Sequence, residues 1–169
     1  MAKELKRTIY KKLGFTGLET ARIVNNLNKL LANYQVHLQK MKNFYWNVKG
    51  DQFFQFRQLF NELKTFADTN IDLIAERIRI FGQAPESKLD FYLKISDIKE
   101  ADENLQSEIM IRETISDFQA LLSYMVDTAD AALDIGDIGT QNMIDSFITE
   151  MEKYHWKLNA CLQGKQIIL

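Results

Sequence analysis

Glycine and proline are scarce in this sequence, and their positions divide it into four long segments. The 169 residues include seven Gly and one Pro, which fall near residue 15, at Gly50, around residue 83, around residue 137 and at Gly164. Glycine is typical of the position just past a helix end, and proline often follows shortly after a helix. We therefore expect four helices, at about 17–49, 52–81, 105–135 and 140–164.

Apolar residues in the first two segments recur at steps of three and four, as one face of an amphipathic helix requires. Thr16 and Glu19 have the spacing of a capping box, so the first helix is predicted to begin there. Asp51 is the predicted cap of the second helix. The apolar series are Val24, Leu27, Leu31, Tyr34, Leu38, Met41, Tyr45 and Val48 in the first segment and Phe53, Phe56, Phe60, Leu63, Ala67, Ile71, Ile74, Ile78 and Phe81 in the second.

The lengths of the connections predict how the helices are arranged. Only a few residues separate the first helix from the second and the third from the fourth, which makes both pairs antiparallel hairpins. Residues 83–104 form a long crossover, and the portion 87–98 is expected to hold a short helix. The sequence thus predicts an all-α four-helix bundle in one domain, residues 16–169, preceded by a basic tail at residues 1–15.

Composition excludes several other classes of protein. A hydrophobic content of 46% excludes a disordered chain, and one cysteine, Cys161, excludes an internal disulfide framework. The formal charge of −2 gives no overall attraction to nucleic acid. We find no signal-peptide pattern and no apolar stretch near 18 residues, so we expect a cytoplasmic protein that does not bind membranes.

The second predicted helix carries a stripe of polar residues. At 100° per residue, Arg57, Asn61, Asp72 and Glu76 share one stripe, yet Arg57 and Glu76 stand about 28 Å apart along the axis. Two copies packed antiparallel about a two-fold axis near residues 66–67 would place Arg57 opposite Glu76 and Asn61 opposite Asp72. The alternative is a solvated face whose salt bridges contribute little.

Three stretches of the sequence carry a resemblance to a known family. They are Tyr45–Gly50 (YWNVKG), Gln52–Phe54 (QFF) and Ile71–Arg77 (IDLIAER). They resemble Dps, the DNA-binding proteins from starved cells, which are mini-ferritins, and the resemblance spans nearly the whole chain. It implies a ferritin-like bundle, assembly into a twelve-subunit shell, and oxidation of ferrous iron at sites shared between two-fold-related subunits. Some members of the family bind DNA.

The family's iron ligands are only partly present. Tyr45 and Arg57 stand where the family has two histidines, and Asn61 stands where it has an aspartate. Only the partner-side carboxylates, Asp72 and Glu76, match. Iron prefers imidazole and carboxylate ligands, whereas a guanidinium keeps its proton and has no lone pair to offer.

We therefore expect a degenerate ferroxidase centre, with iron weakly bound and ferrous oxidation weak or absent. Arg57 is expected to pair with Asp72 or Glu76 across the two-fold axis, with Tyr45 hydrogen-bonded nearby. The alternative is that Tyr45 fills the core and Arg57 is a surface charge.

A second departure concerns the route by which iron enters the family's shell. Asn142 stands where the family commonly has an acidic residue facing a three-fold channel. Asp134, Asp137 and Asp145 can still supply negative charge, and whether such a channel attracts cations depends on which side chains line it.

The other candidate ligands are interpreted as structural. Glu152 and His155 form the one Glu-x-x-His motif, which is too few for a di-iron centre within one chain. His37 lies beside apolar rows of the first helix, so we expect a hydrogen-bonded, partly buried imidazole.

The tail is a candidate contact for DNA phosphates because it is rich in positive charge. Its acidic residue is Glu4, and its basic residues are Lys3, Lys6, Arg7, Lys11 and Lys12. Interleaved apolar residues favour docking of the tail on its own shell, and a shell of twelve negative chains repels DNA. Two alternatives to an iron-storing shell stay open. One is a DNA-binding or structural shell without metal chemistry, and the other is a subunit that co-assembles with an active paralogue.

Overall fold

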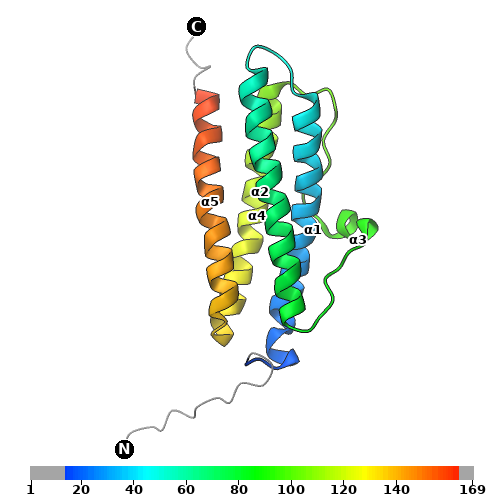
Figure 1. Ribbon diagram of the computed structural model, residues 1–169, viewed down its shortest axis with the longest axis vertical. Helices are drawn as coiled ribbons and strands as arrows, with labels where there is room; N and C mark the ends of the chain where they lie inside the picture. Colours follow the sequence, from blue (N-terminus) through cyan, green and yellow to red (C-terminus); the bar gives the residue numbers. More distant parts are fainter. Residues whose placement is uncertain (1–13, 164–169) are drawn as a thin grey trace, which may run out of the picture.

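The computed structural model describes residues 14–163, in which four long helices form a bundle and one short helix lies beside it (Figure 1). This arrangement confirms the predicted all-α bundle. Residues 1–13 of the predicted tail (1–15) and the last residues, 164–169, lie outside the described part of the chain. The long helices are α1 (Gly17–Asn47), α2 (Phe53–Ile80), α4 (Ser107–Ile135) and α5 (Ile138–Gln163), and the short one is α3 (Leu89–Ile95).

The connections arrange the bundle as two hairpins joined by a crossover. Helix α1 is antiparallel to α2 and also to α4, since Arg22 early in α1 contacts Asp134 late in α4 (Nη1 to Oδ2, 2.6 Å). Helices α2 and α4 therefore run in the same direction, and the segment between them returns along the bundle and carries α3, which packs on α1 (Figure 1).

The apolar stripes of the four long helices meet in one continuous core. Burying a large apolar side chain contributes about 1.5–3 kcal/mol, so these stripes hold the helices together. Most of the apolar residues predicted for the first two helices are buried. Those half-buried at the edge of the core are Val24, Tyr45, Phe53 and Phe81.

The start of α1 follows the prediction, but the start of α2 does not. Glu19 accepts a hydrogen bond from the Thr16 backbone (2.7 Å), and Thr16 Oγ1 accepts one from the Glu19 backbone (3.3 Å), which completes the capping box. The Thr16 hydrogen bonds hold the pKa of Glu19 below its usual value. Asp51 does not cap α2, because the turn at Gly50 places Gln52 at the cap position, and no side chain there bonds to the helix.

Helices α4 and α5 are joined by two residues with different tasks. Gly136 adopts φ 71°, a conformation that favours glycine, and ends α4. Asp137 then caps α5 by accepting hydrogen bonds from the Thr140 backbone (3.2 Å) and the Thr140 hydroxyl. Arg77 of α2 forms an ion pair with Asp137 and donates to Thr140 Oγ1 (2.9 Å). This buried network fastens the end of α2 to the start of α5.

The same network corrects the expectation for one of the three aspartates, Asp134, Asp137 and Asp145, that the sequence suggested as sources of free negative charge near the channel position. Asp137 is 1% exposed, and its charge is balanced by Arg77, so it adds no free negative charge there. Asp134 pairs with Arg22, whereas Asp145 is exposed. None of the described helices is long and apolar enough to cross a bilayer.

Gly139 provides a test of the Arg77 network. A Cβ atom at this position would lie 2.8 Å from Arg77 Nη2, so Gly139→Ala displaces the guanidinium from Asp137. We expect thermal or urea unfolding to show a loss of about 1–3 kcal/mol, typical of hydrogen bonds to charged groups. Gly17→Ala is the matched control, since a Cβ atom there meets nothing within 4 Å. Equal stability of the two variants would contradict this role for Arg77.

Candidate functional site

The structure brings Tyr45 and Arg57 together at the junction of α1 and α2. Arg57 Nη2 donates a hydrogen bond to the Tyr45 hydroxyl (3.1 Å), and the guanidinium carbon lies 4.5 Å from the centroid of the Tyr45 ring. The Phe53 ring lies on the same guanidinium at 5.7 Å. Tyr45 and Arg57 are both half-buried, so the aromatic rings limit the positions open to the guanidinium.

Lys64 joins this group, although none of the sequence motifs includes it. Its Nζ lies 4.6 Å from the centroid of the Tyr45 ring, so Tyr45 has a cation–π contact with both Lys64 and Arg57. Because both cations lie so close to one ring, they cannot be more than about 9 Å apart. Lys64 follows Arg57 by seven residues, or two turns of a helix, and this spacing is the signal that would have found it.

The other predicted site residues are exposed on α2. Asn61 lies between Arg57 and Lys64 on the same side of the helix, whereas Asp72 and Glu76 lie in its second half. Asp72 is about 22 Å along the axis from Arg57 of its own chain, so the two cannot meet within one subunit.

The charged residues of this face have no internal ion-pair partners. Within residues 14–163, Arg57, Lys64, Asp72 and Glu76 form no salt bridge with their own chain. Their charges are therefore available to another molecule.

The group around Tyr45 does not suit a metal ion within one chain. The Tyr45 oxygen already accepts a hydrogen bond from Arg57, and protonated Arg57 and Lys64 have no lone pair for a metal. The part of the chain that the structure describes contains no cluster of three or more His, Cys, Asp or Glu side chains placed to hold a metal. Two positive charges in the group also repel a cation.

A second cluster of titratable residues lies in the core between α1 and α4. Asp117 Oδ2 contacts His37 Nδ1 (2.9 Å), and Asp117 Oδ1 accepts a hydrogen bond from Lys40 Nζ (2.8 Å). Lys40 also pairs with Glu113 (3.2 Å), whose side chain is 45% exposed. His37, Lys40 and Asp117 are buried, so the prediction of a hydrogen-bonded His37 is confirmed, and its burial is more complete than expected. The charges within the cluster compensate one another, which is typical of a structural role.

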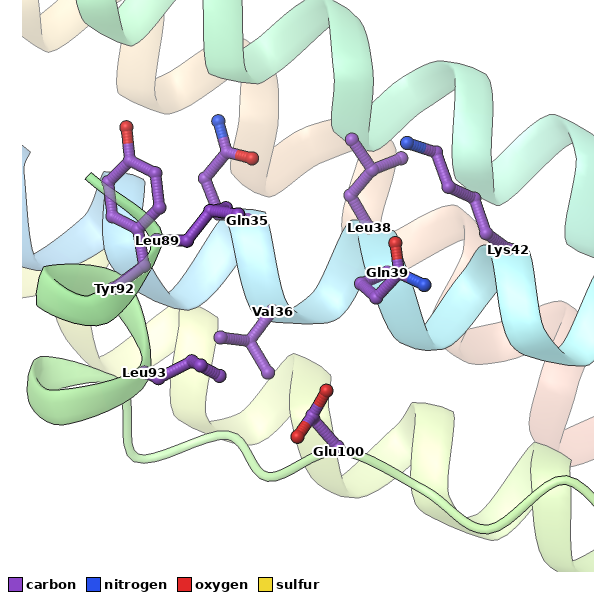
Figure 2. Close-up of a pocket in the computed structure, with 9 residues that line it drawn as sticks. All are labelled: Gln35, Val36, Leu38, Gln39, Lys42, Leu89, Tyr92, Leu93 and Glu100. Carbon is purple, nitrogen blue, oxygen red and sulfur yellow. The ribbon is translucent and has the colours of Figure 1, made fainter. Parts of the chain in front are cut away.

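A groove between α1 and α3 is the third candidate site (Figure 2). It has a volume of about 350 Å³, and Val36, Tyr92 and Leu93 supply apolar surface to it. Its two charged lining residues, Lys42 and Glu100, are not an ion pair. Such a lining suits apolar contact better than acid–base or metal chemistry.

Comparisons with known proteins agree with the helical arrangement. A family model described as a ferritin-like domain matches residues 24–167. The chain is 36% identical over 141 residues to DNA protection during starvation protein 2 of Bacillus anthracis, an alignment that covers 83% of this chain and 97% of that protein. It is 35% identical over 137 residues to DNA protection during starvation protein of Brevibacillus brevis, with 81% and 92% of the two chains covered.

The structure is also similar to a solved structure of the same group. The crystal structure of the DPS protein from Vibrio cholerae O1 superposes with a TM-score of 0.87 at 32% identity, covering 93% of this chain and 99% of that chain. That protein is described as a member of a broad superfamily of ferritin-like diiron-carboxylate proteins.

The buried cluster predicts a large effect of one conservative substitution. Asp117→Asn keeps the size of the side chain but leaves the buried Lys40 charge without its closest counter-charge, so we expect a loss of about 3–5 kcal/mol in unfolding free energy. Glu113→Gln is the matched control, because this partner is half-exposed and its pair is worth about 1 kcal/mol or less. Urea unfolding at one fixed protein concentration measures both. A smaller loss for Asp117→Asn than for Glu113→Gln would show that the buried pair is not structural.

Proposed function

The chain belongs to the Dps mini-ferritins of the ferritin-like family, and from this membership we propose that it is a shell-forming subunit whose intersubunit ferroxidase centre is blocked. The observation that carries the proposal is the contact of Arg57 with Tyr45, at the two positions where the family resemblance implies histidines. Neither side chain in this state is a ligand for ferrous iron, since the guanidinium has no lone pair and the phenol is hydrogen-bonded to it.

The proposed assembly is a homo-oligomer, a dodecamer built on a two-fold axis through α2. Antiparallel packing of two α2 helices about residues 66–67 places Arg57 opposite the partner's Glu76 and Asn61 opposite the partner's Asp72. The exposure of Asn61, Asp72 and Glu76 supports this arrangement, because all three are accessible to a second copy. An isologous interface of this kind repeats each contact twice.

Arg57 then takes the place of a metal ion in binding the partner's carboxylates. A guanidinium and a carboxylate form short, charge-assisted hydrogen bonds, often two in parallel. The carboxylates that would hold iron in an active member are in this way neutralised by protein. Asp72 and Glu76 remain the residues through which iron would bind weakly, wherever Arg57 is displaced.

Restoring the imidazoles tests the blocked centre. The variant Tyr45→His with Arg57→His and Asn61→Asp is expected to oxidise ferrous iron roughly tenfold or more faster than the wild type, because ligand environment alone changes metal affinity by about 10–100-fold. Anaerobic loading of the purified assembly with ferrous iron, followed by oxygen and absorbance measurements, gives the rates. Arg112→His, an exposed change on α4, is the control for an added surface histidine. Oxidation by the wild type as fast as by the restored variant would overturn the proposal.

A second proposed activity is DNA binding through the basic tail. The relatives from Bacillus anthracis and Brevibacillus brevis are named for DNA protection during starvation. Five basic residues at positions 3–12 of this chain can contact phosphates, and each contact adds a salt-dependent contribution to affinity.

Removing residues 1–13 tests the tail and keeps every residue with which the described bundle begins. Phe15 stays on the Phe81 ring (centroids 6.2 Å apart), and the Thr16–Glu19 cap is kept. We expect the full chain to retard duplex DNA in a gel at low salt and the truncated chain to lose this ability, as counterion release predicts. Retardation of DNA by both proteins to the same extent would exclude the tail as the DNA contact.

A further inference from the structure

We infer that Lys64 is a second cation of the intersubunit centre, and that α2 binds a second copy of this chain through two reciprocal sets of cation–carboxylate pairs. This inference rests on the proposed function, because it assumes the same two-fold axis. It adds a residue whose position has no part in the family pattern set out above. Under this inference the centre consists of ion pairs between side chains of the two subunits.

The first observation is the separation of charge along one side of α2. At 100° per residue, Arg57, Lys64, Asp68, Asp72 and Glu76 fall within an arc of about 120°. The two cations occupy the first half of this face and the three carboxylates the second half. None of the five forms an ion pair inside the described chain. We call this surface the charged face of α2.

Arg79 also lies on this side of α2, near the end of the helix, and its guanidinium contacts the backbone beyond the helix. Its guanidinium Nη1 donates to the carbonyl oxygen of Gln83 (3.0 Å), just beyond the helix end. Arg79 keeps its positive charge, so the second half of the charged face, with three carboxylates and Arg79, has a net formal charge of −2.

The second observation is that this face is complementary to itself only in the antiparallel orientation. With the axis between residues 66 and 67, Arg57 lies at the level of the partner's Glu76. Lys64 is displaced by one residue, about 1.5 Å, from the level of the partner's Asp68, and by about 4.5 Å from the partner's Asp72. The lysine side chain is long enough to reach either carboxylate. A parallel pair would place like charges together, which disfavours that orientation.

The third observation is that Tyr45 holds both cations near the positions they need. The Arg57 and Lys64 groups lie 4.5 and 4.6 Å from the Tyr45 ring centroid, and both side chains are half-buried. A cation that is already ordered loses less side-chain entropy on binding. Tyr45 is thus a positioning residue for the two cations.

The charges at each centre nearly balance without a metal. Arg57 and Lys64 of one chain face Asp68, Asp72 and Glu76 of the other, so these five groups have a formal charge of −1. An active family centre, with neutral imidazoles and carboxylates, is negative until metal binds.

A charge exchange between Lys64 and Asp72 tests the inference in the full-length chain. Lys64→Glu places two negative groups together, and Asp72→Lys places two positive groups together, so each single variant is expected to dissociate roughly tenfold more readily. The double variant, Lys64→Glu with Asp72→Lys, restores opposite charges at both reciprocal contacts and is expected to associate more tightly than either single variant. Sedimentation velocity over a series of NaCl concentrations measures the assembled fraction.

Control variants distinguish an effect at the proposed interface from a general effect of charge reversal. Lys29→Glu makes the same charge change at an exposed position of α1 and is expected to assemble as the wild type. If a reversed charge prevents folding, as circular dichroism would show, the neutral variants Lys64→Gln and Asp72→Asn form a second cycle. In that cycle each single change weakens association, and the double variant is no weaker than either.

Two outcomes would overturn the inference. They are single variants that associate as tightly as the wild type at every salt concentration, and a double variant that shows the summed defect of both. If wild-type iron oxidation is slow, either result contradicts only the inference about Lys64, and the proposal of a blocked ferroxidase centre is unaffected. Rapid wild-type oxidation would instead contradict the proposed function.

Discussion

The contact between Phe44 and Phe60 fixes the register of α1 against α2, and the candidate site depends on that register. Both rings are fully buried, and their centroids lie 5.4 Å apart. Tyr45 follows Phe44 on α1 and lies at the edge of the core. Arg57 and Lys64 lie three residues before and four after Phe60, so one turn of helix separates each of them from the buried ring. A core contact thus determines which outer side chains meet, because close-packed rings allow little sliding between the helices.

The sequence was sufficient for the elements that local chemistry determines. Glycine positions and apolar periodicity predicted the four long helices and the crossover helix, and the spacing of Thr16 and Glu19 predicted the first helix start. Asp51 failed as a cap because the turn geometry at Gly50, which no side-chain propensity reveals, moved the start of α2.

The sequence did not predict the contacts between residues that are distant in the chain. Asp117 lies 77 residues from Lys40, and periodicity cannot say which buried polar residues share a contact. The seven-residue spacing from Arg57 could have indicated Lys64, but its contact with the Tyr45 ring on another helix could not be predicted from the sequence. The proposed two-fold pairing is different, because the helical spacing of the polar stripe on α2 was enough to suggest it, whereas only an assembly of two chains can test it.

Adjacent residues near the end of α2 lie about 100° apart around the helix, so one can contact the bundle while its neighbour is exposed. Glu76 faces outward, whereas Arg77 turns inward to Asp137 and Thr140. At the other end of α2, the outward Arg57 follows the buried Phe56 in the same way. Residues that decide the chemistry can therefore be exchanged while those that hold the bundle stay as they are. Under the proposed function, exchanging Tyr45, Arg57 and Asn61, none of which is fully buried, changes the metal chemistry and leaves the buried residues of the bundle unchanged.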